Sequence, residues 1–254
     1  MLGIGFRAPP FVTGDMLMDA QAHFCEVWPR EGVGFLGATG FKSVPNVSDD
    51  PENTFIIPPE AWTDYEAEHG PVLAVLHSHP KTAPVPSSAD MQGQIDSAVP
   101  WGIMQSSAEG CSDPTWFGDQ LDPLPLIGRQ FVHGVADCYS MIRDWFWQEK
   151  GIRLPDYPRD VEWWHSGGDL YSTFFGHAGF SVVTGGIEAV QPGDVFLMKL
   201  RSKVINHGGV YTGDGLILHH IEGYLSHHVP LNLWGNHVEF WVRHHALADS
   251  PGTP

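Results

Sequence analysis

The chain has 254 residues, which is enough for one or two domains with sizeable cores and too long for a small disulfide scaffold. It carries 30 acidic and 13 basic residues, and the resulting net charge of −17 argues against binding to a polyphosphate backbone. Its many glycines, prolines and tryptophans are typical of a loop-rich globular protein rather than of a coiled coil or a disordered chain.

In chain order, the hydrophobic pattern predicts a mixed α/β domain followed by an α+β domain. The elements predicted for the first domain are a helix at 15–28 and strands at 35–36, 54–57 and 72–76. Those of the second domain are a helix at 137–148 and strands at 194–200, 204–211, 216–221 and 237–243. The second domain is therefore expected to pack a helix on an antiparallel sheet.

A break in the pattern between residues 112 and 125, with three prolines, acidic residues and a glycine, indicates a boundary between the two domains. We expect one domain at 1–115, a linker at 116–123 and a second domain at 124–254. The tail at 249–254 is expected to be unstructured.

Two histidines directly follow the apolar run at 72–76, in the sequence His77-Ser78-His79-Pro80. Because side chains alternate along a strand, His77 and His79 would project from the same face, and Pro80 would end the strand. Further on, Ser87 has the character of a helix N-cap, which places Asp90 in the first turn, where its carboxylate could turn back as a third ligand. Two imidazoles and one carboxylate with an open fourth position form the ligand set of a catalytic Zn²⁺ site. Each half of the pattern also has a structural alternative, since histidines can end a strand and Ser87 with Asp90 can form a capping box.

Together with Glu31 in the segment 31–37, Glu-Gly-Val-Gly-Phe-Leu-Gly, these residues resemble the JAMM/MPN family of zinc metalloproteases over residues 1–115. The resemblance implies an α/β layer fold, with His77, His79 and Asp90 as zinc ligands. It also implies Glu31 as general base and Ser87 as a hydrogen-bond donor to the oxyanion.

The three cysteines, Cys25, Cys111 and Cys138, are an odd number without metal-type spacing, so a disulfide framework is not expected. Cys25 and Cys111 are predicted to pack as small apolar side chains. Cys138 lies at the start of the helix predicted at 137–148, where the helix dipole favours a thiolate. It is therefore the candidate nucleophile, and it requires a base. On this feature alone, a cysteine near a helix start is more often a packed side chain without a catalytic role.

The candidate base is His207, which precedes a predicted hairpin that returns to His219. A loop centred on Gly213 would place the two imidazoles opposite each other, so that His219 could orient His207. A tight turn at Asp214-Gly215 would instead place Val210 opposite His219, and the sequence leaves both registers open. Without the cysteine, a polar hairpin edge or an adventitious metal clamp would explain these histidines equally well.

The segment 137–140 (Asp-Cys-Tyr-Ser), the segment 191–195 (Gln-Pro-Gly-Asp-Val), the segment 207–215 and His219 together resemble the NlpC/P60 family, over residues 124–254. The resemblance implies a papain-like fold and cleavage of the peptide stems of the bacterial cell wall, without a cofactor. It also implies Cys138 as nucleophile, His207 as general base and acid, and His219 as the orienting residue. The backbone amide of Cys138 would belong to the oxyanion hole.

The order of the two domains in one short chain resembles the tail assembly K proteins of lambda-like siphophages. The resemblance implies a virion component at the tail tip, with other tail tip proteins as partners, that opens peptidoglycan in the host periplasm as DNA enters. We see no export signal and no apolar run near the roughly 18 residues of a membrane span, so synthesis in the host cytoplasm is expected. The alternative is a structural tail-tip assembly or plug protein in which one or both sites are inactive.

Overall fold

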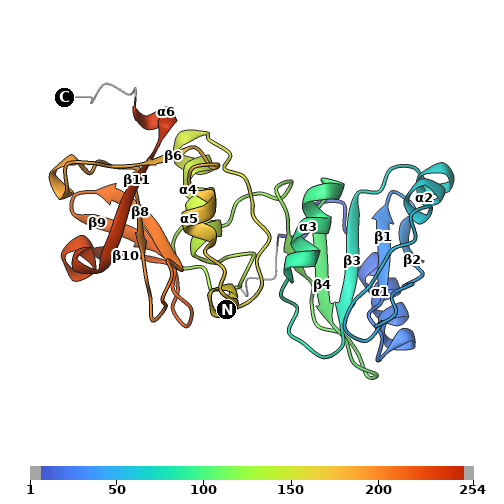
Figure 1. Cartoon of the computed structure of the whole chain (residues 1–254). Coiled ribbons are helices and arrows are strands. Elements are labelled where there is room, and N and C mark those ends of the chain that lie inside the picture. Colours follow the sequence, from blue (N-terminus) through green and yellow to red (C-terminus); the bar gives the residue numbers. More distant parts are fainter. Residues whose placement is uncertain (1–6, 249–254) are drawn as a thin grey trace. The chain divides into compact units, whose positions relative to one another are not determined.

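The computed structural model describes residues 7–248, and the tail at 249–254 lies outside the described residues. The chain divides between Asp122 and Pro123 into two compact units (Figure 1). Within residues 7–248, no helix is long and apolar enough to cross a membrane.

The first unit is built on a five-stranded sheet of order β2-β1-β3-β4-β5. Strands β3 and β4 pair in parallel, and the other neighbours are antiparallel. The strands are β1 (Val33–Gly37), β2 (Gly40–Val44), β3 (Ala74–His79), β4 (Trp101–Gln105) and β5 (Thr115–Phe117). The helices are α1 (Gly14–Val27), α2 (Ala61–His69) and α3 (Ser88–Ser97).

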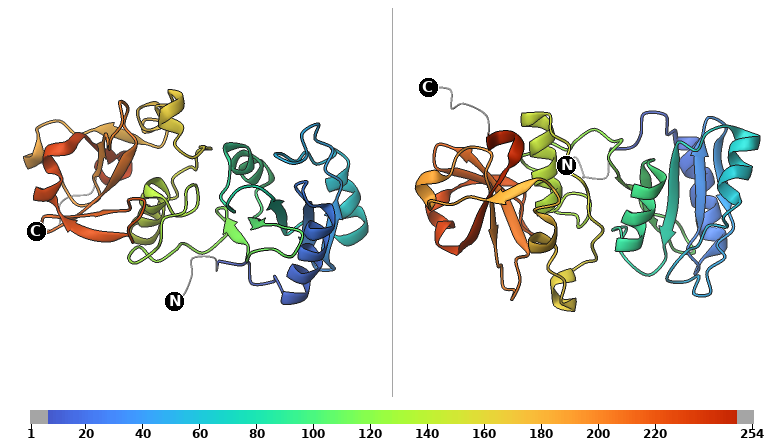
Figure 2. Two further views of the ribbon diagram at one scale, coloured as in Figure 1. Left: turned by 90° about the horizontal axis from the view of Figure 1, so that it is seen from below. Right: turned by 45° about the horizontal axis from the view of Figure 1, so that its top comes forward.

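Helices cover both faces of this sheet. Leu76 on β3 belongs to a buried cluster with Phe24 of α1, so α1 covers the face to which Leu76 points. On the opposite face, Phe35 of β1 packs edge-on against Tyr65 of α2. Figure 2 shows α1 and α3 on opposite sides of the strands. Because both faces are covered, β3 is buried along its whole length, as its continuous apolar run indicates.

The strand predicted at 54–57 is absent, and that prediction was wrong. The segment is irregular, because the side chain of Asn46 occupies the backbone groups that a neighbouring strand would need. The Asn46 amide donates to the carbonyl oxygen of Thr54 at 3.0 Å, and its oxygen accepts from the Ile56 amide at 3.1 Å. The predictions of the helix at 15–28 and of strands at 35–36 and 72–76 are confirmed by α1, β1 and β3.

The second unit has a six-stranded antiparallel sheet of order β10-β9-β8-β7-β11-β6. Its strands are β6 (Phe180–Val182), β7 (Val195–Met198), β8 (His207–Gly213), β9 (Leu216–His219), β10 (His227–Pro230) and β11 (Val238–His244). Its helices are α4 (Cys138–Lys150), α5 (Leu170–Phe174) and α6 (His245–Ala248), with short 3-10 turns at Trp163–Ser166, Ile187–Ala189, Leu231–Leu233 and Gly235–His237. The structure thus confirms a helix on an antiparallel sheet.

Helix α4 begins where Asp137 caps it, its side chain accepting from the Ser140 amide at 2.8 Å, and it ends at Gly151 with a φ of 67°. The apolar stripe of α4 is buried against the sheet in one cluster with residues of β7, β8, β9 and β11. This packing fixes the start of the helix, and with it Cys138, against the beginning of β8.

Candidate active sites

The first candidate site forms where β3 ends beside the start of α3. His77 and His79 project from the same face of β3, and Pro80 follows the last residue of the strand. Ser87 caps α3, so Asp90 lies in its first turn and turns back toward the strand. The capping box and the convergence on the histidines are therefore both present, and the two explanations of Ser87 and Asp90 do not exclude each other.

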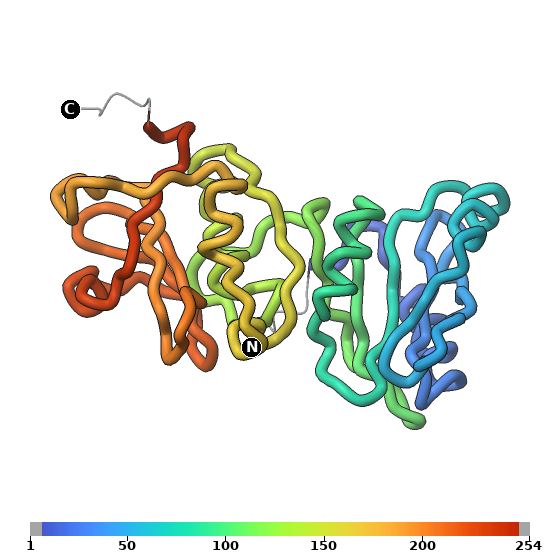
Figure 3. Tube along the Cα trace, in the orientation of Figure 1, coloured from blue at the N-terminus to red at the C-terminus, as the bar shows by residue number. Residues whose placement is uncertain are grey.

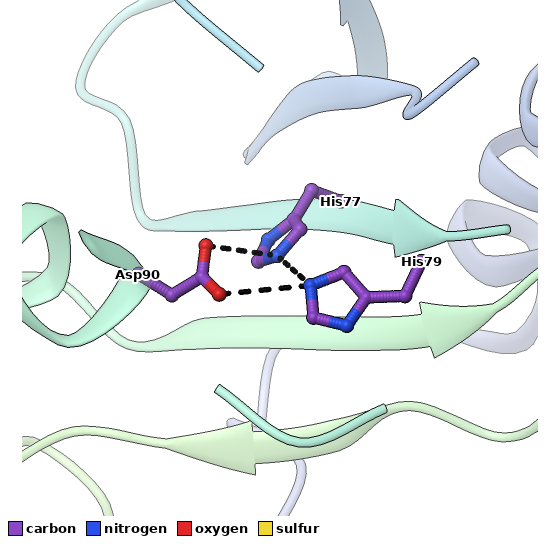
Figure 4. A group of neighbouring side chains, drawn as sticks. All are labelled: His77, His79 and Asp90. Atoms are coloured by element: carbon purple, nitrogen blue, oxygen red, sulfur yellow. Dashed lines mark hydrogen bonds and ion pairs between the residues drawn. The ribbon is translucent and has the colours of Figure 1, made fainter. Parts of the chain in front are cut away.

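Three ligand atoms converge at this point (Figure 4). The Nε2 atoms of His77 and His79 lie 3.2 Å apart. The two carboxylate oxygens of Asp90 lie 3.3 Å from His77 Nε2 and 3.6 Å from His79 Nε2. All three side chains are buried, and the ligand atoms lie within 4.8 Å of one another. This is the donor set expected of a zinc site.

Outer contacts hold these donors in orientation. His79 Nδ1 lies 3.1 Å from the carbonyl oxygen of Ala83, which favours the tautomer with an unprotonated Nε2. The amide and the hydroxyl of Ser87 donate to Asp90 Oδ2 at 2.8 and 2.7 Å. An Nδ1–H to carbonyl bond and a hydrogen-bonded carboxylate are the usual surroundings of metal ligands, so the residues present fit a divalent metal ion.

The charges also suit a cation. Burial opposes ionisation of Asp90, but the interactions with His77, His79 and Ser87 outweigh it and hold the pKa of Asp90 well below its usual range. Burial lowers the pKa of His77. Burial also opposes protonation of His79, yet Asp90 raises its pKa, so a metal ion would displace a proton there.

Glu31 is buried just before β1, and burial raises the pKa of its carboxyl to about 7. The charge of His79 lowers this pKa and that of Asp90 raises it. A carboxyl group that ionises near neutral pH is suited to accept and return protons.

The second candidate site centres on Cys138, the first residue of α4. Its Sγ lies 3.3 Å from the hydroxyl of Tyr171, which belongs to α5, and 4.0 Å from the carbonyl oxygen of Asn206. The backbone N–H of Gly208 also acts on the sulfur as a hydrogen-bond donor. The sulfur thus lies against the backbone on both sides of His207.

The position at a helix start does not give Cys138 an acidic thiol, and this part of the sequence prediction was wrong. Burial, followed by the negative charge of Asp137, raises the pKa of Cys138 to about 11. The resting side chain is therefore a neutral thiol at neutral pH.

Arg159 neutralises Asp137 next to the sulfur. Its guanidinium forms two hydrogen bonds to the Asp137 carboxylate, at 2.7 and 3.1 Å, and a third to the Ser140 hydroxyl at 3.0 Å. Arg159 reaches this position because the connection after α4 runs back along the helix toward its start (Figure 3). Sequence analysis missed Arg159, since the pattern gives no indication of which cation would meet the buried carboxylate.

The hairpin of β8 and β9 has neither of the two registers considered from the sequence. Its turn is the tight pair Asp214-Gly215, with φ of 52° and 72°, but a bulge at Thr212 shifts the pairing so that Gly209 lies opposite His219. Without the bulge, Val210 would lie opposite His219, and His207 and His219 would point to opposite faces. The bulge therefore puts the two histidines on the same face.

The two imidazoles are joined by a hydrogen bond of 3.3 Å between His207 Nε2 and His219 Nδ1. Burial lowers the pKa of His207 to about 3 and that of His219 to about 4, so both rings are neutral. The bond occupies Nε2 of His207 and leaves Nδ1 for another proton. Among the hydrogen bonds of residues 7–248, none joins the Cys138 sulfur to the His207 ring, and the sulfur is hydrogen-bonded to Tyr171 instead.

The other two cysteines lie in the first unit. Cys25 and Cys111 are half-buried free thiols, and Cys138 is also free.

Family models match both units. Residues 15–117 match the model of prokaryotic homologs of the JAB domain, and residues 128–239 match the NlpC/P60 family. These matches confirm the two family resemblances of the sequence.

Two phage proteins are similar to most of the chain. The tail tip assembly protein K of Escherichia phage lambda is 38% identical over 169 residues, which are 66% of this chain and 78% of that protein. The protein of the same name from Escherichia phage N15 is 31% identical over 220 residues, which are 83% of this chain and 86% of that protein.

Solved structures give weaker likenesses. The NlpC/p60 domain of the peptidoglycan hydrolase SagA is 17% identical, covers 46% of this chain and 88% of its own, and has a TM-score of 0.30. An NlpC/P60 family protein from Bacillus cereus is 14% identical, covers 88% of this chain and 66% of its own, and has a TM-score of 0.32. Both TM-scores are low, so the family assignment rests on the two phage proteins.

Proposed function

Because this chain belongs to the family of tail tip assembly protein K, we propose that it is a phage tail tip component whose second unit is a cysteine endopeptidase acting on peptidoglycan stem peptides. The proposal assigns the domains as a JAB-like unit at 1–115, a linker at 116–123 and an NlpC/P60 unit at 124–254. Its partners are other tail tip proteins. It acts from the virion, in the host periplasm, as DNA enters.

Cys138 is the nucleophile of the proposed reaction, and His207 is its base. Since the thiol has a pKa of about 11 and the ring one of about 3, a thiolate–imidazolium pair is not formed at rest. The proton therefore passes from sulfur to His207 Nδ1 as Sγ attacks the stem-peptide carbonyl, and from Nδ1 to the leaving amine. Catalytic hydrogen bonds are often long in free enzymes and shorten when the substrate binds. The proposed reaction requires such a shortening between the Cys138 sulfur and the His207 ring.

Two further groups act on the same steps. His219 accepts from His207 Nε2–H, which leaves Nδ1 unprotonated and able to accept the thiol proton. The backbone amide of Cys138 lies at the start of α4 and donates to the oxyanion. Water then releases the acyl group by the reverse sequence.

In the first unit we assign His77, His79 and Asp90 as ligands of a zinc ion. When bound, the ion supplies an acidified water for peptide hydrolysis. Glu31 takes up and returns protons near neutral pH. The Ser87 amide holds the Asp90 carboxylate, and the Ser87 hydroxyl turns from Asp90 to donate to the oxyanion.

The observation that carries the cysteine proposal is the His207–His219 hydrogen bond next to the backbone that the Cys138 sulfur touches. Digestion of purified sacculi by the whole chain tests it. Wild type and Cys25→Ala, which removes a half-buried thiol of the first unit, are expected to release soluble stem-peptide fragments, and Cys138→Ala none. Equal release by Cys138→Ala would remove the proposal.

One observation favours the alternative, a structural tail-tip protein with an inactive cysteine site. The hydroxyl of Tyr171 lies within hydrogen-bond distance of the Cys138 sulfur, where His207 would be needed, and the thiol is neutral at rest. Under this alternative, phages carrying Cys138→Ala or His77→Ala would plate like wild type, while deletion of the gene would abolish tails.

A further inference from the structure

Tyr171 is the side chain that meets the sulfur of Cys138. Its hydroxyl oxygen lies 3.3 Å from Sγ, although the two residues are 33 positions apart in the chain. Burial raises the pKa of the Tyr171 phenol well above its usual value, so the phenol keeps its proton. A protonated phenol next to a sulfur that is to lose its own proton is a hydrogen-bond donor.

Neighbouring rings hold Tyr171 in place. Its ring lies edge-on to Tyr139 at a centroid distance of 6.1 Å and tilted against Trp163 at 6.4 Å. Asp169 caps the short helix α5, accepting from the Ser172 amide at 3.3 Å. The hydroxyl is thus directed at Sγ by packed aromatic groups and not by a free loop.

The other groups around the sulfur do little to favour a thiolate. Asp137, next in the chain, disfavours negative charge, and Arg159 from the connection after α4 offsets it through the ion pair. On the side of β8, His207 is neutral and Gly208 offers one backbone N–H. The Tyr171 hydroxyl is therefore the principal side-chain donor available to the sulfur.

We propose that the Tyr171 hydroxyl donates a hydrogen bond to the Cys138 sulfur and stabilises its thiolate form, which makes Tyr171 an activating residue of the cysteine site. The inference rests on the proposed function for its biological role. In the step itself, the thiol proton leaves for His207 Nδ1, Sγ gains the electron pair, and Tyr171 keeps its proton throughout.

The test is the pH dependence of Cys138 alkylation by iodoacetamide, measured on the whole chain as the modification of the Cys138 peptide by mass spectrometry. Only the thiolate reacts, so the midpoint of the profile reports the pKa of the thiol. The matched control is Tyr157→Phe, since the Tyr157 hydroxyl bonds to His177 and its ring stacks on Phe174 of α5.

Tyr171→Phe is expected to shift the midpoint upward by about one pH unit, as loss of a hydrogen bond to a charged group requires. Tyr157→Phe is expected to leave it in place.

A Tyr171→Phe profile that coincides with wild type, or alkylation that is faster at every pH as removal of a mere shield would give, overturns the inference. Alkylation is measured without peptidoglycan. A chain with the expected shift that digests no sacculi would therefore overturn the proposed function and leave the role of Tyr171 standing.

Discussion

His207 and His219 are joined by a hydrogen bond of 3.3 Å, although the residue directly opposite His219 on β8 is Gly209. Diagonal partners on one face of an antiparallel pair are within reach of long side chains, and the twist of the strands shortens one diagonal. The bulge at Thr212 supplies the common face. The hydrogen bond between the proposed base, His207, and the orienting residue, His219, therefore depends on the extra residue that the bulge adds to β8.

His219 is predicted to act by fixing the tautomer of His207. His219→Leu is expected to lower the rate of stem-peptide hydrolysis by about 10²- to 10⁴-fold, because Nε2–H of His207 loses its acceptor. His219→Asn is expected to retain more activity, since its side-chain oxygen can accept the same bond. Initial rates on soluble stem peptides measure both, and equal losses in the two variants would refute the tautomer role.

The ion pair of Arg159 and Asp137 is predicted to support the start of α4. Arg159→Met leaves a buried carboxylate without its cation and is expected to lower the free energy of unfolding by about 3–5 kcal/mol. Lys199→Met, which breaks the exposed pair with Glu239, is expected to cost under about 1 kcal/mol. Urea unfolding measures both, and a loss for Arg159→Met as small as that of the control would contradict the assignment.

Acid is predicted to destabilise the second unit through its buried imidazoles. The unfolded chain binds protons on these rings at about pH 6.5, whereas folded His207 and His219 do so only at about 3 and 4. The contribution of the two neutral rings to the free energy of unfolding is thus fully present above pH 6.5 and is lost as the pH falls toward the pKa values of the folded state. The loss is about 1.4 kcal/mol per pH unit for each ring.

Urea unfolding midpoints between pH 7 and about 4.5 measure this slope. His207→Gln removes one of the titrating rings, so its stability is expected to fall less steeply with acid than that of wild type. Identical slopes for the two proteins would show that His207 is not held neutral by burial.

Metal binding is predicted for the first unit. After dialysis, wild type is expected to retain about one zinc ion per chain, and His77→Ala and Asp90→Asn essentially none. His228→Ala, which removes an exposed histidine of β10 in the second unit, is expected to keep the zinc. Elemental analysis gives the contents, and equal zinc in all four proteins would place any bound metal elsewhere.

The sequence predicted the helices and strands in which apolar and polar side chains recur at regular spacing. The alternation through His77 and His79 and the helix that begins at Cys138 depend on local spacing, and both were found as expected. The segment 54–57 has a strand-like composition, but the contacts of Asn46, at a distance along the chain, decide its structure. Local patterns do not report such competition for backbone groups.

The details of the cysteine site were beyond local patterns for the same reason. The bulge at Thr212 lies beside Gly213, whose φ is 100°, and a glycine at this position is compatible with a turn centre as well as with a bulge. Tyr171 reaches the start of α4 from the short helix α5, over 33 positions of chain, and Arg159 from an irregular connection, over 22 positions. The thiol pKa depends on the burial that these contacts create, so the helix position alone gave the wrong direction.

The chemical ends produced in digested sacculi test the lytic assignment most directly. If a cysteine attacks the stem with a histidine as its base, wild type creates new free amino groups within the stem peptides, and His207→Ala creates none. New reducing sugar ends without new amino groups, or equal numbers of amino groups from the two proteins, would contradict it.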